Sequence, residues 1–144
     1  MTAIREQIFV EIEQRLGAIA SPMIAEVSRM PPGDPSAFPA LFIFDQGDTP
    51  AIEEEETDTE AFILQVGIDG FVTGEAPHSA GHTLYDAVKR ALMTQPPLGG
   101  LAEEIRQGRL DMAIAERAKD HRLGFGVEFN ILYRTRFGEP QEIG

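Results

Sequence analysis

The stretch that decides the fold spans residues 123–136 and reads LGFGVEFNILYRTR. Its odd positions carry large apolar side chains, namely Leu123, Phe125, Val127, Phe129, Ile131 and Tyr133. The positions between them hold mostly glycine or polar residues, ending on Arg134 and Arg136. A period of two over this length is typical of a long strand with one buried face. The sequence therefore predicts a protein organised around a sheet, with Arg134 and Arg136 on the polar face of its last strand.

Periodicity elsewhere predicts two helices. Ile4, Ile8, Ile12 and Leu16 recur every four residues, which indicates an amphipathic helix that begins at a Thr2 cap. A second helix is expected over residues 79–93, with Ser79 as its N-cap. One further helical turn is expected at residues 102–105.

Shorter apolar runs predict strands over residues 24–30, 40–44, 62–73 and 110–114. Gly67 and Gly70 indicate a bend or bulge within the third of these strands. Residues 118–121 form a connection short enough to make the last two strands a hairpin. The order α-β-β-β-α-β-β predicts an α+β fold, with a single mixed or mainly antiparallel sheet of four to five strands and both helices on one face.

Length and composition predict one soluble, intracellular domain over residues 1–144. Hydrophobic residues make up 42% of the chain and charged residues 25%, which is a globular composition. There is no cysteine, no secretory signal pattern, and no apolar run near the ~20 residues that span a bilayer. The net charge of −12 disfavours nucleic acid as a tightly bound ligand, because neutralising phosphates requires clustered lysine and arginine.

The negative charge is concentrated in one segment. Residues 1–72 hold 14 acids and 3 bases, whereas residues 73–144 hold 10 acids and 9 bases. Residues 45–60 alone contain eight acids and no base, including Glu53, Glu54, Glu55, Glu56 and Asp58. Adjacent like charges repel one another and keep the backbone solvated, so the sequence predicts a mobile acidic loop here.

Two groups of residues raise the question of a metal site. His78 and His82 have a metal-ligand spacing if both lie on one helix, but a cap at Ser79 would leave His78 outside it. The glutamate run offers oxygen ligands to Mg²⁺ or Ca²⁺, yet it lacks the regular spacing of an EF-hand loop. Surface histidines and a solvated loop are the simpler interpretations. No catalytic constellation is apparent, since even Asp120-His121 has no serine or cysteine beside it.

The layout as a whole resembles the small tail terminator proteins of long-tailed bacteriophages. The resemblance rests on the N-terminal helix, the acidic segment, Pro97-Leu98-Gly99-Gly100-Leu101, and the closing strand with Tyr133-Arg134-Thr135. It implies a homohexameric ring that caps the tail tube, stops its polymerisation and joins the tail to the neck of the head. It also implies no enzymatic activity, no cofactor and no membrane, with DNA only as passing cargo. The expected location is the head-proximal end of the tail in the virion, after assembly in the host cytoplasm.

A ring of this kind needs a heterologous contact between neighbouring copies. We expect one side of that contact to be acidic and the other to carry arginines. The candidate interface residues are Glu53, Glu54, Glu55, Glu56, Asp58, Arg109, Arg134 and Arg136. It is equally open whether the loop instead lines the lumen of the ring, where its negative charge would repel DNA. Two other classes compete with a ring subunit: a small-molecule or divalent-cation binding α+β domain, and, more remotely, a two-metal hydrolase.

Overall fold

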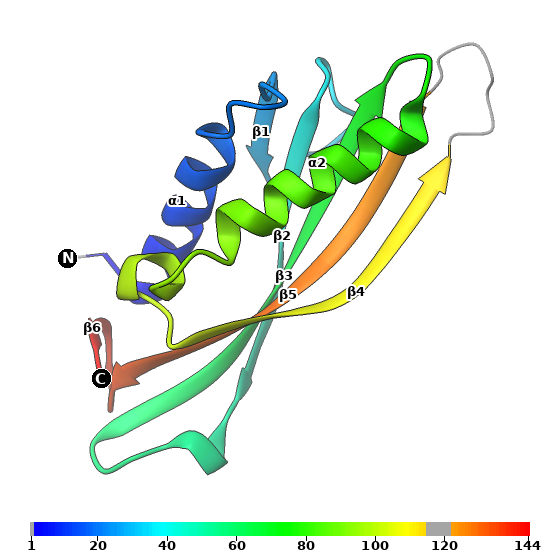
Figure 1. The fold of residues 1–144 in the computed structure, drawn as a ribbon. Helices are drawn as coiled ribbons and strands as arrows, with labels where there is room; N and C mark the ends of the chain where they lie inside the picture. Colours follow the sequence, from blue (N-terminus) through cyan, green and yellow to red (C-terminus); the bar gives the residue numbers. More distant parts are fainter. Residues whose placement is uncertain (1, 115–121) are drawn as a thin grey trace.

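The computed structural model describes residues 2–114 and 122–144, and it has two helices packed on a curled sheet (Figure 1). The elements in chain order are α1 (Ile4–Gly17), β1 (Glu26–Arg29), β2 (Ala40–Pro50), η1 (Ile52–Glu54), β3 (Thr59–Thr73), α2 (Pro77–Leu92), η2 (Pro97–Gly100), β4 (Glu104–Ile114), β5 (Arg122–Arg136) and β6 (Glu139–Ile143). The predicted turn at residues 118–121 lies outside the described residues.

The sheet has the strand order β1-β2-β3-β5-β4, and β6 pairs with the end of β5. β1 pairs with β2 in parallel and all other pairs are antiparallel, so the sheet is mixed. The α+β class predicted from the sequence is confirmed. The strand β6 was not predicted, because the run Glu139–Ile143 contains a proline and two glutamates and has no apolar alternation.

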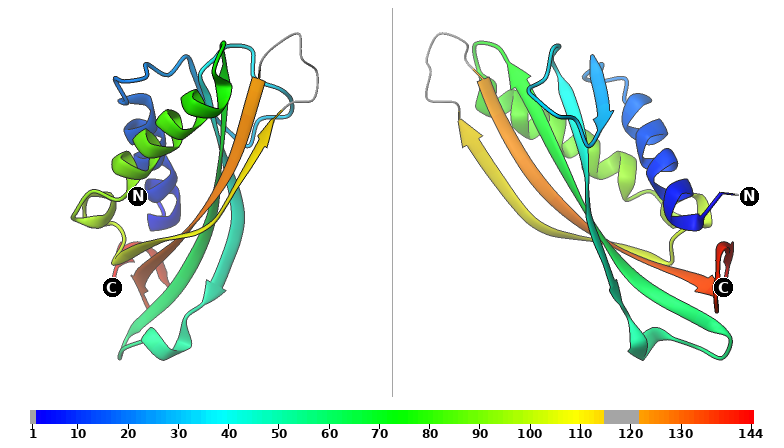
Figure 2. Two further views of the ribbon diagram at one scale, coloured as in Figure 1. Left: turned by 45° about the vertical axis from the view of Figure 1, so that its right-hand side comes forward. Right: turned by 180° about the vertical axis from the view of Figure 1, so that it is seen from behind.

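Both helices cover the same face of the sheet, as the side view in Figure 2 shows. The four periodic residues of α1 are at most 2% exposed, and so they form the helix side of the core. All six odd-numbered apolar residues of β5 are also buried, which confirms the predicted strand face. β5 lies between β3 and β4 and is therefore an interior strand of the sheet, paired on both sides. Its buried face explains why this stretch decides the fold.

Local signals at the helix ends were less reliable than the core pattern. Helix α2 begins two residues earlier than predicted, with Pro77 in its first turn and Ala76, not Ser79, as the N-cap. Proline suits a first helical turn because its missing N–H has no partner there anyway. Helix α1 is preceded by Ala3 at the N-cap, which makes no side-chain hydrogen bond, so Thr2 is not the cap. The turn expected at residues 102–105 is wrong, since η2 ends at Gly100 and β4 begins at Glu104.

The predicted bulge lies on a different strand. β3 pairs with β5 without interruption from Thr59 to Thr73, so Gly67 and Gly70 produce no bulge in that pair. The irregularity is in β2 between Asp45 and Asp48, where Gly47 has φ 95°. Gly70 has another reason to be glycine: a Cβ there would lie 2.2 Å from the ring of Phe125. Close approach of the buried ring, not backbone bending, explains this residue.

Candidate functional site

The most distinctive surface is the connection between β2 and β3, residues 51–58, which we call the acidic tip. It projects from the end of the long β2–β3 hairpin, away from the helices (Figure 1). Glu53, Glu54, Glu55, Glu56 and Asp58 are all exposed there. The tip has a defined backbone, because Glu54 N donates to Ala51 O at 2.9 Å and Thr59 N donates to Glu56 O at 3.1 Å. Five carboxylates are thus displayed together at one end of the molecule.

The expected loop was longer than the observed one. Residues 45–50 belong to β2, and Thr59 and Glu60 belong to β3, so only residues 51–58 lie between the two strands. Acids, a glycine and a proline made residues 45–50 look like a loop. In the fold they extend β2 beyond the apolar run, because Arg5 compensates the two aspartates of this stretch.

The Arg5 contacts form a small charged network beneath the hairpin. Arg5 Nη2 donates to Asp45 Oδ1 at 2.6 Å, and Arg5 Nε donates to Asp48 Oδ1 at 2.8 Å. The hydroxyl of buried Tyr133 donates to Asp48 Oδ2. The hydrogen bonds from Arg5 lower the pKa of Asp45, while burial raises the pKa of Tyr133. Asp45 and Asp48 are therefore held by a residue far away in the sequence, and they do not belong to the mobile loop predicted over residues 45–60.

The turn between β5 and β6 lies beside the acidic tip. Phe137 N donates to Asp58 O at 2.7 Å, and Gly138 N donates to Glu60 Oε1 at 2.9 Å. Two large apolar side chains are strongly exposed at this end, since Ile52 and Phe137 are each 73% exposed. Single exposed apolar side chains are common on protein surfaces, but these two add apolar area next to the exposed carboxylates of the tip. This end of the molecule thus combines negative charge with apolar contact area.

Arg134 does not lie on an exposed polar face, and that part of the sequence interpretation is wrong. Its side chain is buried, with residue exposure of 7%, and Nε donates to Glu103 Oε1 at 2.7 Å. Nη1 donates to Thr59 Oγ1 at 3.1 Å, at the base of the acidic tip. The bond to Glu103 raises the pKa of Arg134, and the charges of Glu54 and Glu56 act in the same direction. Arg134 therefore holds the base of the tip from inside the subunit.

The other two candidate arginines are exposed and paired locally. Arg136 Nη1 lies 3.2 Å from Glu142 Oε2 on β6. Arg109 Nε lies 2.9 Å from Asp111 Oδ2 on β4, next to the irregularity between Gln107 and Leu110. Exposed pairs of this kind are individually weak, so both side chains can exchange partners in an assembly. Their role at a subunit interface stays a prediction.

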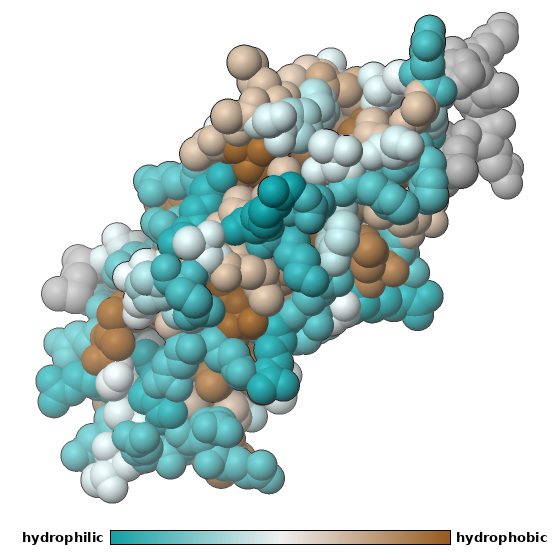
Figure 3. Space-filling view, viewed as in Figure 1, coloured by the Kyte–Doolittle hydropathy of each residue, from teal (hydrophilic) through white to brown (hydrophobic). Residues whose placement is uncertain are grey.

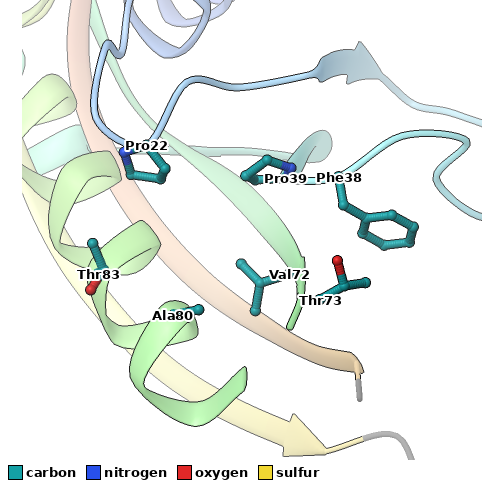
Figure 4. A pocket seen from close by; sticks show the side chains of 7 residues that line it. All are labelled: Pro22, Phe38, Pro39, Val72, Thr73, Ala80 and Thr83. Atoms are coloured by element: carbon teal, nitrogen blue, oxygen red, sulfur yellow. The ribbon is translucent and has the colours of Figure 1, made fainter. Parts of the chain in front are cut away.

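The structure contains an apolar cavity of about 320 Å³ between α2 and the end of β3 (Figure 4). It is lined by apolar and hydroxyl side chains from several elements, namely Pro22, Phe38, Pro39, Val72, Thr73, Ala80 and Thr83. This volume is at the lower end of the range for small-molecule sites. None of these lining residues is ionisable. The cavity can hold a small apolar group, but its lining offers no general acid or base.

Within the described ranges 2–114 and 122–144, no group of three or more histidine, cysteine, aspartate or glutamate side chains is positioned to hold a metal ion. His78 and His82, however, both lie within α2, with ring centroids 4.3 Å apart. The prediction that His78 lies outside the helix is therefore wrong, because the cap is at Ala76.

In the described part of the chain, no helix is long and apolar enough to cross a membrane.

The surface of the molecule on the side of the helices is mainly hydrophilic, with small separate hydrophobic patches (Figure 3).

No known protein family and no curated protein matches the sequence. Among solved structures, the chain is similar to one from the structure described as "Virion of native gene transfer agent (GTA) particle". The match has a TM-score of 0.54 and 16% sequence identity, and covers 90% of each chain. The two chains therefore share a fold over nearly their whole lengths.

Proposed function

We propose that the protein is a structural subunit of a phage-like virion, and more narrowly a ring-forming tail terminator. The shared fold with a chain of a gene transfer agent virion carries the broader proposal. The element order and the closing Tyr133-Arg134-Thr135 strand, which resemble the tail terminator family, support the narrower one. In this function the protein caps the tail tube, ends its polymerisation and joins the tail to the neck of the head. It acts without chemistry of its own.

The surface of the subunit supports assembly through unlike faces. In the described residues, the five acids of the tip form no ion pair, whereas Arg5, Arg15 and Arg29 are all engaged within the subunit. The uncompensated charge of the tip is thus available to a partner. Ile52 within the tip and Phe137 beside it supply apolar area that such a contact would bury. A closed ring uses one surface of each copy against a different surface of the next.

The proposed partners follow from this role. They are further copies of the chain in a hexameric ring, the tail tube protein below it, and the neck protein above it. DNA passes through the ring without specific binding, and a negatively charged lumen would repel it. The proposed location is the head-proximal end of the tail, reached after assembly in the host cytoplasm.

Molar mass in solution tests the proposal. Light scattering should be measured on the protein alone and mixed with the tail tube protein, where the ring predicts a species of six chain masses of 15.8 kDa. Negative-stain microscopy of that fraction should show closed rings, alone or on tube ends. A protein that stays at one chain mass with tube protein present, and leaves tube length unchanged, would contradict the proposal.

The alternative of a small-molecule binding domain has one observation in its favour, the apolar cavity between α2 and β3. It predicts a monomer that a small apolar ligand stabilises against heat. Filling the cavity with Ala80→Leu should abolish that ligand effect, whereas it should leave ring formation intact.

A further inference from the structure

Two of the three histidines of the sequence lie in the first turns of helix α2. Because this helix begins at Pro77, the residues at positions 78 and 82 are one helical turn apart and share a face. Both histidines are exposed, and their ring centroids lie 4.3 Å apart with a 57° angle between the ring planes. Two imidazoles therefore stand side by side on a regular helix at the surface.

We propose that His78 and His82 form a two-ligand site for a divalent transition-metal ion of the Zn²⁺ class. Imidazole nitrogen binds Zn²⁺ at about 2.0–2.1 Å, so neighbouring rings one turn apart can share one ion after small rotamer adjustments. Imidazole suits zinc, copper and nickel, whereas Mg²⁺ and Ca²⁺ prefer oxygen ligands. The site is distinct from the acidic tip, which has only oxygen ligands, and it does not depend on ring formation.

The surroundings of the pair leave coordination positions open. His82 lies at the edge of an open hollow of about 630 Å³, whose other lining residues include Thr83, Tyr85 and Leu110. Asp86 is one turn further along α2, but its carboxylate is paired with Arg90. The remaining positions on the ion are therefore filled by water or by a group from another molecule. Two protein ligands and open positions predict an accessible site of modest affinity.

Two electrostatic effects act on this site in opposite directions. The positive end of the α2 dipole disfavours a cation near its first turn. The net charge of −12 favours any cation at the surface, although salt screens this effect. Neither effect discriminates between metals. The selectivity comes from the nitrogen ligands, and Cu²⁺ should bind most tightly in the first-row series.

Titration calorimetry of the full chain with Zn²⁺, in a buffer that does not chelate metals, tests the site. The wild-type protein should bind one ion per chain, with no competition from millimolar Mg²⁺. His78→Ala and His82→Ala should each weaken binding by about tenfold or more, because each leaves a single metal–nitrogen bond. The double variant should bind Zn²⁺ only slightly more weakly than either single variant, without a further loss of about tenfold. His121→Ala, which removes the third histidine of the sequence, is the matched control and should bind as the wild type does.

Cu²⁺ provides an independent readout. Its electron paramagnetic resonance spectrum should show coupling to two imidazole nitrogens in the wild type and to one in each single variant. Thermal melting curves followed by circular dichroism should be unchanged in the variants, because both side chains are exposed. Glutamine variants at the two positions repeat the test in case an alanine variant fails to fold. The proposal is overturned if each single variant keeps wild-type affinity, or if His121→Ala weakens binding as much as the other two.

Discussion

Replacing Phe129 with alanine tests whether β5 is the centre of the core. The side chain is 1% exposed, and its backbone lies opposite Val66 on β3 and Gln107 on β4. Ile12 of α1 and Leu92 of α2 surround the same narrow internal space. Helices and strands therefore enclose the ring from both sides, and the site has little freedom to collapse. Burial of this kind predicts a loss of about 3–5 kcal/mol for Phe129→Ala.

Urea unfolding followed by circular dichroism measures the loss. The midpoint should fall while the slope m stays constant, since the exposed surface on unfolding changes little. The protein concentration must be the same for all variants, because association adds to apparent stability. Phe137→Ala is the matched control when both proteins are measured as unassembled subunits: the same residue type is 73% exposed there, so its change should stay within about 0.5 kcal/mol. A loss below about 1 kcal/mol for Phe129→Ala would refute the assigned strand face.

The remaining predictions address the sheet, the charge network and the tip. Gly70→Ala should cost about 1–3 kcal/mol of stability, since the new Cβ would overlap the Phe125 ring. Gly17→Ala is its control, because the space around Gly17 is open, and it should cost nothing. Equal stabilities of the two variants would contradict the close approach. Arg5→Ala should cost about 1 kcal/mol at neutral pH. Arg5 lowers the pKa of Asp45, so this difference should shrink as the pH falls below the ordinary aspartate value of about 4, and a difference that persists in acid would disprove the linkage. Changing the four tip glutamates to glutamine should weaken assembly if the tip meets arginines, or strengthen it if tips face one another; an unchanged assembly and salt response would remove the tip from the interface. Hydrogen exchange should be fast at residues 52–57 and slow in the part of β2 that pairs with β3, and protection of the tip in a monomer would argue for a preformed ion site.

Sequence periodicity predicted the parts of the fold that apolar burial determines. The stripes of α1 and β5 are repeated over several turns or residue pairs, so single exceptions do not alter them. Helix ends depend on one or two residues, and Ser79 was a weaker signal than Pro77. The early start of α2 then changed the interpretation of the histidine pair.

The distant partners of the buried and half-buried charged residues were not visible in the sequence. Asp45 and Asp48 look like loop residues until Arg5, 40 and 43 positions away, is placed against them. Arg134 alternates with the apolar residues of β5 and was therefore assigned to an exposed face. It is buried because Glu103 and Thr59 supply partners from other parts of the chain. The chemistry of each segment was readable in the sequence, whereas its partners required the fold.

The position of β5 between β3 and β4 has a consequence for biosynthesis. β3 ends at Thr73 and pairs with a strand that begins only at Arg122, so the central pairing closes a long stretch of chain. Contacts of such sequence separation make folding slow, because the chain must lose entropy before they form. The edge of β3 that pairs with β5 has no partner strand until the ribosome has released β5. The nascent protein should therefore need protection from aggregation until β5 has been synthesised, and only then become competent to associate.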